Sequence, residues 1–321
     1  MRSLSTAAST SALLLVASLL SSCRGAVQAG PSFSVLPTPA GARMQVPFRP
    51  LEGLDWVESS RTRRTESAWE DGKQGPVRRS EVEMVTASRW ASAEEAGYRV
   101  KQSVREVKAQ LDGKPVEDPL LVLATRFPVE LRVAGDGAFV ELTNREAVRA
   151  AVEAAFPDEA QRQQVLEFFT PEAVEEQARL EWEQKYGGLF GRPLEASHPL
   201  YAVEATAVGP LPLAYMVERR LKGTAKTALG EAVVLEQSCV QEAGKAVDAA
   251  AWTAAWEARG KPALDPSLQC EGELVWAVSP FVPLSSRLTL RARPADASGR
   301  VAGELEFERA TTLREPSGGV K

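Results

Sequence analysis

The chain has 321 residues, with 38 Lys and Arg against 43 Asp and Glu, a net charge of −5 and 44% hydrophobic residues. This composition is that of an ordinary folded protein and excludes a mostly disordered, collagenous or multi-span membrane chain. One histidine, three cysteines and no positive net charge argue against histidine-built metal sites, disulfide-dense scaffolds and non-specific nucleic-acid binding. The sequence therefore predicts no cofactor, no metal site and no nucleic-acid partner.

The first 22 residues have the pattern of a signal peptide. Arg2 gives a positive start, and the apolar run from Ala12 to Leu20 is far shorter than the ~20 residues that span a bilayer. The next residues complete Leu20-Ser21-Ser22-Cys23, which matches the bacterial lipobox, and on these residues the chain resembles a bacterial lipoprotein. The resemblance implies cleavage before Cys23, a diacylglycerol on its sulfur and a further acyl chain, such as palmitate, on its amine.

Lipidation at Cys23 would hold the protein on a membrane. Two or more acyl chains anchor firmly because each buried CH₂ contributes about 0.8 kcal/mol. In enteric bacteria an Asp after the cysteine favours the inner membrane, so Arg24 favours the outer membrane. The expected location is therefore the cell envelope, as an outer-membrane lipoprotein, and a plain secreted protein is the alternative. Residues 23–53 are rich in proline and predict a flexible, extended tether.

Residues 54–315 predict a single α+β body that is mainly antiparallel β, a curved sheet or half-barrel interrupted by a group of short helices. Period-two patterns, such as Val82 to Trp90, indicate half-buried strands, and Asp-Gly pairs indicate tight turns between them. The element order also allows two sub-domains, 54–190 and 195–315, and residues 316–321 predict a loose tail. The predicted strands are 57–69, 77–90, 97–111, 127–133, 138–143, 200–221, 228–240, 269–279, 284–293 and 301–312.

Three short helices are predicted in the middle of the chain. Asn144 is placed to cap the first helix, which Pro157 stops, and Asp158 is placed to cap the second. Pro171 opens the third, which runs to about Tyr186. A further helix is predicted over residues 246–258, where two tryptophans lie one helical turn apart.

Cys239 and Cys270 are the cysteines that remain after lipidation. Export places them in an oxidising compartment, so a disulfide is predicted, and two buried free thiols are the alternative. Closing a loop of this length would stabilise the fold by roughly 3–4 kcal/mol in the chain-entropy model.

No motif indicates catalysis. His198 is the only histidine, and the proline after it favours an exposed loop, while no Gly-x-Ser-x-Gly elbow is present. The glycines of 187–191 follow a helix, so they predict a helix stop rather than a phosphate loop. The carboxylates of 167–183 predict a solvated helix face. The arginines of 61–64 and 78–79 predict cross-strand ion pairs with nearby glutamates, with docking on an anionic membrane as the alternative. We predict that the protein is not an enzyme.

The order of elements, the Asp-Gly turn before Phe139 and the placement of the cysteines resemble uncharacterised lipoproteins of delta-proteobacterial type, a resemblance that implies no known activity. Two functions stay open. The favoured one is a non-catalytic scaffold that contacts other envelope proteins, and the alternative is a carrier for a lipid or other hydrophobic ligand. The residues assigned either to the core or to the ligand cavity of such a carrier are Trp90, Tyr98, Val100, Phe139 and Trp276.

Overall fold

A computed structural model describes most of the body of the protein. The predicted signal peptide 1–22, Cys23 and the predicted tail 316–321 lie outside the described residues. The described residues are 34–37, 43–53, 55–70, 73–93, 97–116, 119–168, 170–186, 189–190, 193–208, 211–296 and 299–314.

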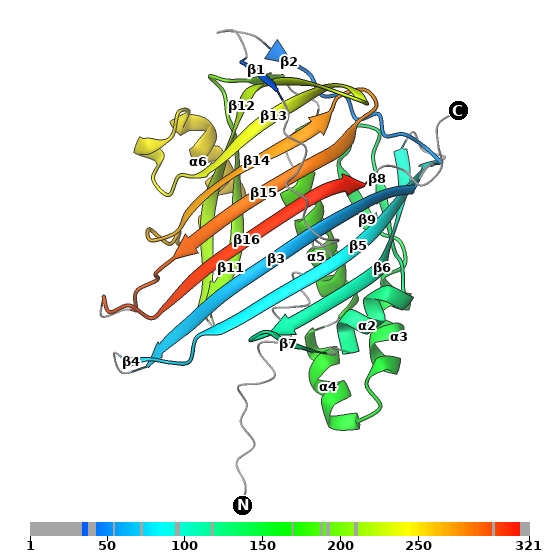
Figure 1. The fold of residues 1–321 in the computed structure, drawn as a ribbon, viewed down its shortest axis with the longest axis vertical. Helices are drawn as coiled ribbons and strands as arrows, with labels where there is room; N and C mark the ends of the chain where they lie inside the picture. The colour runs from blue at the N-terminus through cyan, green and yellow to red at the C-terminus, as the bar shows by residue number, and fades with distance from the viewer. Residues whose placement is uncertain are drawn as a thin grey trace, which may run out of the picture.

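The body is dominated by antiparallel strands, with a few short helices (Figure 1). The strands are β1 (Val35–Pro37), β2 (Arg43–Met44), β3 (Asp55–Glu70), β4 (Lys73–Gln74), β5 (Arg78–Ala93), β6 (Gly97–Leu111), β7 (Lys114–Pro115), β8 (Val129–Val133), β9 (Phe139–Leu142), β10 (Leu194–Glu195), β11 (Leu200–Val208), β12 (Leu211–Thr227), β13 (Gly230–Cys239), β14 (Gln269–Ala277), β15 (Val282–Ala292) and β16 (Gly303–Arg314). The helices are α2 (Pro119–Arg126), α3 (Arg145–Ala155), α4 (Glu159–Phe168), α5 (Pro171–Tyr186), α6 (Ala249–Ala258) and the 3₁₀ helix η2 (Ala243–Lys245).

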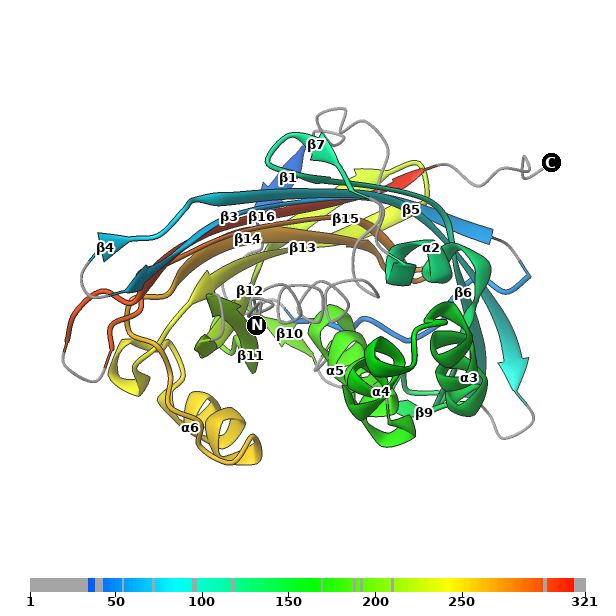
Figure 2. The ribbon, with the colours of Figure 1, turned by 90° about the horizontal axis from the view of Figure 1, so that it is seen from below.

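One large sheet runs in the order β1-β12-β13-β14-β15-β16-β3-β5-β6-β8-β9, and β11 pairs with β12. The two ends of this order do not pair with each other, so the sheet is open. In Figure 2 the sheet forms an arch, and the helices lie beneath it on the concave side. The predicted fold of a curved antiparallel sheet with short helices is confirmed at this level. Among the described residues, no helix has the length and apolar character needed to cross a bilayer.

The first half of the chain is the predicted meander, β3-β5-β6-β8-β9. Asp112 and Gly113 have φ of 51° and 77°, so the Asp-Gly pair supplies the two left-handed residues of a tight turn, as expected. The sequence reasoning missed α2, which lies between β7 and β8.

The three central helices, α3, α4 and α5, are confirmed, and Asn144 occupies the predicted N-cap position of α3, but its side chain does not cap the helix. Its Oδ1 instead accepts a hydrogen bond from the Glu130 backbone N–H at 3.0 Å, and its Nδ2 donates to the Pro128 carbonyl at 2.9 Å. The amide therefore ties the start of α3 to the strand β8.

The second half differs from prediction at one strand. Residues 200–221 were predicted as one strand, but the structure has two antiparallel strands there, β11 and β12. Gly209-Pro210, a dipeptide typical of turns, separates them in the sequence. The helix predicted at 246–258 is present as α6, and the remaining strands agree within a few residues.

Part of the predicted tether belongs to the folded body. The strand β1 pairs with β12, and a Cβ at Gly223 would lie 2.3 Å from the Leu36 carbonyl oxygen, so this approach requires glycine. Further along, Val46 and Phe48 are only 2% and 6% exposed. The flexible tether predicted over 23–53 is therefore wrong for these residues, because scattered apolar side chains in a proline-rich segment can still reach the core.

Two apolar cores lie on the concave side of the sheet. The larger one lies beneath α5, whose Val174, Ala178, Trp182 and Tyr186 recur every four residues and form one buried stripe. The smaller core packs residues of the β11–β12 hairpin, such as Leu213, against β14–β16. The candidate site lies where these two cores meet.

Candidate functional site

The five residues assigned to a possible ligand cavity all belong to the larger apolar core. Trp90, Val100 and Trp276 are 5%, 1% and 2% exposed, and Tyr98 and Phe139 pack against the same cluster while half-buried. The structure therefore brings the five together, but it packs them as core. Only Trp276 also lines a cavity described below.

Phe48 lies at the centre of this aromatic packing and was missed by the sequence reasoning. Its ring centroid lies 5.6 Å from that of Trp90, 5.4 Å from Tyr98 and 4.6 Å from Phe190, all in edge-on geometry. The Trp182 indole N–H of α5 donates to the Gly137 carbonyl at 2.9 Å. This packing fixes one side of α5 on the sheet.

The neighbouring stripe of α5 is polar and also faces the sheet. Lys185 Nζ lies 2.7 Å from Glu58 Oε2 of β3, and Gln177 Nε2 donates to Glu181 Oε1 at 2.6 Å. Glu58 is 8% exposed, so a carboxylate of the concave face is buried against its ammonium partner. Space remains beneath α5 beside these polar side chains.

Two small cavities occupy this space, with volumes of about 70 and about 40 Å³. The larger is also lined by Leu131, Trp182 and Glu181, and the smaller by Leu274, Trp276 and Arg219. Drug-sized ligands occupy roughly 300–1,000 Å³. These cavities can hold several water molecules or one small polar group. The residues that line both are Glu58, Lys185, Ser286, Arg309 and Thr311.

The strand register explains why polar groups gather here. Ser286 of β15 pairs with Thr311 of β16, which pairs with Ser60 of β3, so three hydroxyl side chains form a row across adjacent strands. Arg309 lies two residues from Thr311 and so on the same face of β16. The concave face is therefore polar in the middle of the sheet and apolar on both sides.

Burial changes the protonation of groups around these cavities. Burial raises the pKa of Glu181 to about 8, although the Gln177 hydrogen bond and the Arg309 charge oppose this shift. Burial alone would lower the pKa of Lys185, but the charge of Glu58 raises it above its ordinary value. At neutral pH the Glu181 carboxyl is therefore mostly protonated, and Lys185 keeps its charge.

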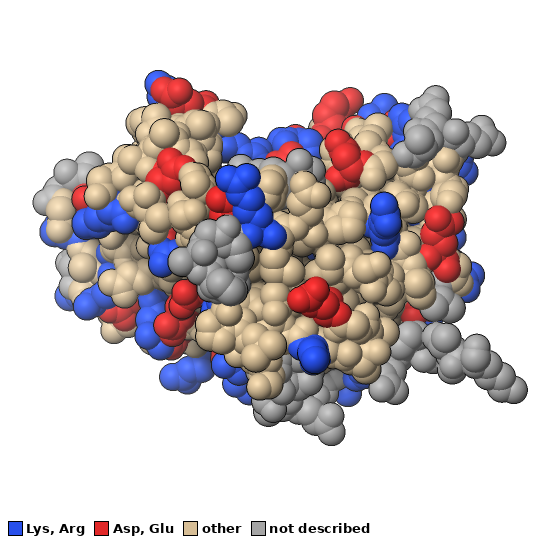
Figure 3. All heavy atoms as spheres, turned by 90° about the horizontal axis from the view of Figure 1, so that it is seen from above, with Lys and Arg blue, Asp and Glu red and all other residues tan. Residues whose placement is uncertain are grey.

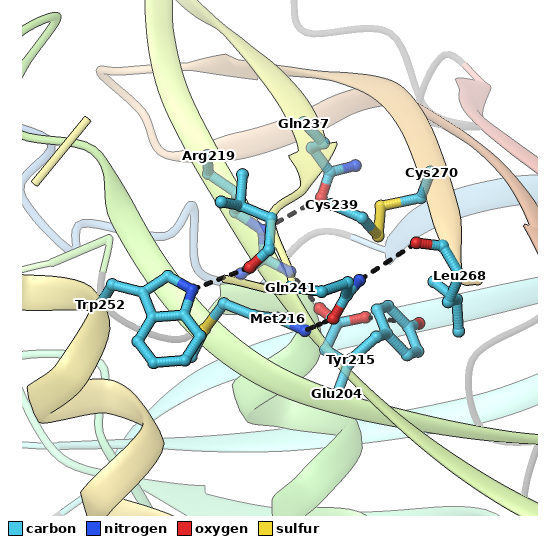
Figure 4. The surroundings of a disulfide bond; sticks show 11 residues. Glu204, Tyr215, Met216, Arg219, Gln237, Cys239, Gln241, Trp252, Leu268 and Cys270 are labelled. Carbon is cyan, nitrogen blue, oxygen red and sulfur yellow. Dashed lines mark hydrogen bonds and ion pairs between the residues drawn. A yellow bond between two sulfur atoms is a disulfide. The ribbon is translucent and has the colours of Figure 1, made fainter. Parts of the chain in front are cut away.

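A second buried charge pair lines the smaller cavity, and its two side chains are drawn in Figure 4. Arg219 Nη2 of β12 lies 2.7 Å from Glu204 Oε1 of β11, and Arg219 Nε donates to Gln237 Oε1 at 3.0 Å. The Tyr215 hydroxyl donates to the other oxygen of Glu204 at 3.1 Å. The two charged side chains are only 3% and 5% exposed, so this network fixes the β11–β12 hairpin to the sheet.

The predicted cysteine pair is a disulfide in the structure. Cys239 and Cys270 lie opposite each other at adjoining ends of β13 and β14, with Cα atoms 5.0 Å apart (Figure 4). The disulfide joins the two ends of the segment 240–269, which carries α6. Within it, the Trp252 indole N–H donates to the Val240 carbonyl at 2.8 Å, and the Gln241 amide donates to the Leu268 carbonyl at 3.2 Å.

His198 is exposed, as predicted, and does not form a catalytic triad. Its Nδ1 lies 3.0 Å from Ser197 Oγ and 3.1 Å from Glu195 Oε2. A triad needs the acid on one ring nitrogen and the nucleophile on the other, whereas here both contacts are to the same nitrogen. No group of three or more potential metal-ligating side chains occurs in the described part of the chain.

Arg61 and Arg63 of β3 form the predicted cross-strand ion pairs, whereas Arg64 pairs with Glu66 of its own strand. Arg61 Nη2 and Arg63 Nε lie 2.6 and 3.1 Å from the carboxylate of Glu81 on β5. Burial alone would raise the pKa of Glu81, but hydrogen bonds from these two arginines hold it below its ordinary value. At the end of the molecule shown in Figure 3, charges of both signs are interspersed with uncharged residues.

No protein-family model matches the chain, and no curated protein matches its sequence. Lipovitellin, in a structure that concerns its lipid–protein interactions, aligns with 85% of this chain at 10% identity and a TM-score of 0.40, and the chain spans 26% of its length. A protein described as exported, with a YmcC-like fold, from Bacteroides fragilis aligns over 85% of this chain and 100% of its own, at 10% identity and a TM-score of 0.22. A domain described as an outer-membrane lipoprotein-sorting protein from Vibrio parahaemolyticus aligns over 82% and 87%, at 9% identity and a TM-score of 0.17. TM-scores of this size establish neither a shared fold nor a shared ligand.

Sequence reasoning also missed the polar residues of the site, although one signal was available. Leu305, Phe307, Arg309 and Thr311 alternate along β16, so the period that assigns Leu305 to the core assigns Arg309 to the same face. A charged residue in register with core positions marks a buried polar site.

Proposed function

We propose that the protein is a non-catalytic, lipid-anchored envelope protein that carries a hydrophobic ligand along the concave face beneath α5. The observation that best supports this is the cavity space under the polar stripe of α5, between two apolar cores. Apolar side chains at Glu181 and Lys185 would pack this space, and unfilled space in a core costs stability. We interpret the space that remains beneath α5, despite this cost in stability, as room for part of a ligand.

The described cavities are too small for a whole hydrophobic ligand, so in this proposal α5 moves when the ligand enters. Its apolar stripe packs in the core, while its other sides are held by ion pairs of Lys185 with Glu58, Glu175 with Arg145 and Glu183 with Arg259. The Glu175–Arg145 and Glu183–Arg259 pairs are partly exposed, and ion pairs of this kind contribute only about 0–1 kcal/mol each. The polar side of α5 is therefore the side that lifts, and the open half-barrel of the sheet then receives the ligand.

The anchor is part of the proposal. The lipobox at Cys23 supports lipidation there, and Arg24 supports the outer membrane. We expect the mature N-terminal peptide to carry the mass of a diacylglycerol and an acyl chain on Cys23, and a Cys23→Ala variant to carry neither. An unmodified N-terminal peptide in membrane-extracted protein would overturn this part.

Probe binding tests the carrier function. The Cys23→Ala chain keeps every described element and carries no acyl chains, so it is titrated with the hydrophobic fluorophore N-phenyl-1-naphthylamine. We expect saturable binding of one probe per chain. Ser286→Trp fills the space shared by both cavities and should weaken binding at least tenfold. The matched control Thr289→Trp, on the opposite face of the same strand by the period of two, should leave binding unchanged.

The dense packing of Trp90, Val100 and Trp276 favours the second candidate, a scaffold that works through surface contacts with other envelope proteins. Under that function the native chain would show no saturable probe binding, and the two tryptophan variants would behave alike. That result would replace the carrier with the scaffold.

A further inference from the structure

Arg309 differs from the other interior cations of the site. Lys185 is paired with Glu58 and Arg219 with Glu204, each at 2.7 Å. Arg309 lies on β16, in the middle of the sheet, is half-buried and lines both cavities. Among the described residues, its guanidinium has no carboxylate within 4.0 Å and makes no hydrogen bond.

Two hydroxyl groups beside Arg309 are also without a partner in the described part of the chain. Ser286 and Thr311 pair directly in the β15–β16 register, and both line the two cavities. Neither side chain makes a hydrogen bond to a described residue. The concave face therefore presents a guanidinium and two hydroxyl donors to the same enclosed space.

The charge around the cavities favours an anion. Glu58 and Glu204 are balanced by Lys185 and Arg219. The remaining acid, Glu181, has a pKa of about 8 and is mostly protonated at neutral pH, so it does not compensate Arg309.

We propose that Arg309, with Ser286 and Thr311, binds the carboxylate head group of a long-chain acid. The guanidinium fork matches a carboxylate in a bidentate arrangement, and the single unpaired charge matches a monoanion. A cavity of about 70 Å³ has room for this compact group. The apolar tail then lies along Leu131 and Trp182, which line the larger cavity, in the groove that opens when α5 lifts.

This inference rests on the proposed carrier function, and its test separates the two. The probe is 9,10-dibromostearate, whose bromines quench nearby tryptophans such as Trp182, and the matched probe is its methyl ester, which lacks the charge. Both are titrated into the Cys23→Ala chain and into versions that also carry Arg309→Met, Arg309→Lys or Arg291→Met. Arg291→Met is the control, because it removes one exposed arginine from the opposite face of the neighbouring strand.

We expect the chain with Arg309 to bind the acid at least tenfold more tightly than the ester. Arg309→Met should bind both alike, with ester affinity unchanged, while Arg309→Lys keeps part of the preference and Arg291→Met keeps all of it. Equal binding of acid and ester by the chain with Arg309 would overturn the head-group inference and leave the carrier function standing. Quenching by neither probe would overturn the carrier function and the inference with it. If Arg309→Met also loses affinity for the ester, the comparison is made between the chain with Arg309 and Arg309→Lys. A larger ratio of acid affinity to ester affinity in the chain with Arg309 supports the inference, and equal ratios overturn it.

Discussion

Burial, rather than distance, should decide what the ion pairs of β12 contribute to stability. Arg219 and Lys222 lie on this strand, and each places a nitrogen 2.7 Å from a glutamate oxygen. The Arg219 and Glu204 side chains are 3% and 5% exposed, whereas those of Lys222 and Glu273 are 46% and 41% exposed. Replacing each cation by methionine keeps an unbranched side chain and removes one charge together with the hydrogen bonds that it donates.

The expected costs differ several-fold. Arg219→Met leaves a buried carboxylate without its cation, and breaking such a pair costs about 3–5 kcal/mol. Lys222→Met removes a solvated pair, which is worth about 0–1 kcal/mol. Urea unfolding, followed by tryptophan fluorescence, measures both costs from the shift in midpoint at constant slope.

A double variant isolates the uncompensated charge. Glu204→Leu with Arg219→Met leaves no charge behind, so it should recover at least about 2 kcal/mol of the loss seen with Arg219→Met alone. Equal costs for Arg219→Met and Lys222→Met, or no recovery in the double variant, would show that the network of Figure 4 is not sealed from water as the structure has it.

Three further predictions concern the aromatic packing, the disulfide and the cavity. Gly137→Ala should cost about 1–3 kcal/mol more than Gly113→Ala, because both glycines have positive φ but only at Gly137 would a Cβ lie 2.5 Å from the Phe190 ring; equal unfolding midpoints would contradict this. Replacing Cys239 and Cys270 by alanine should lower the free energy of unfolding by about 3–4 kcal/mol, and two reactive thiols in unreduced, denatured protein would refute the bond. Because burial raises the pKa of Glu181 to about 8, from about 4.3 in the unfolded chain, the folded state binds the extra proton between these values and stability falls as the pH rises through this window. Urea unfolding at pH 5, 6.5, 8 and 9 measures the free energy of unfolding of Glu181→Gln relative to that of the native chain. This difference should shift in favour of the variant as the pH rises to about 8 and then stay level, whereas a difference that is constant at all four pH values would contradict the raised pKa.

The sheet and its helices were predictable because their signals are local. The period of two along β5 and β6 and the proline at the start of α5 depend only on neighbouring residues. Prediction from neighbouring residues failed where a residue distant in the sequence determines what a side chain binds. Asn144 has the position of a helix cap, yet its amide binds β8, and this partner cannot be seen from helix periodicity.

The candidate site was less predictable than the fold. Phe48 was hidden because its proline-rich surroundings predict an extended tether, and only the long-range packing of the aromatic cluster gives it a role. Ser286, Thr311 and Ser60 become one row only once the β15-β16-β3 register is known. The period of two along β16 places Arg309 on the core-facing side, so its position could have been predicted from the sequence. That it has no ion-pair or hydrogen-bond partner among the described residues is known only from the structure.

Native mass spectrometry of the protein extracted from its own membranes in mild detergent tests the carrier function most directly. The reference is the mass of the triacylated chain from Cys23 to Lys321 with one disulfide. The account predicts an additional, stoichiometric mass that is released on denaturation and identified as a long-chain acid. A mass that matches the bare lipoprotein, in material that also fails to bind the hydrophobic probes, would contradict the carrier function and favour the scaffold.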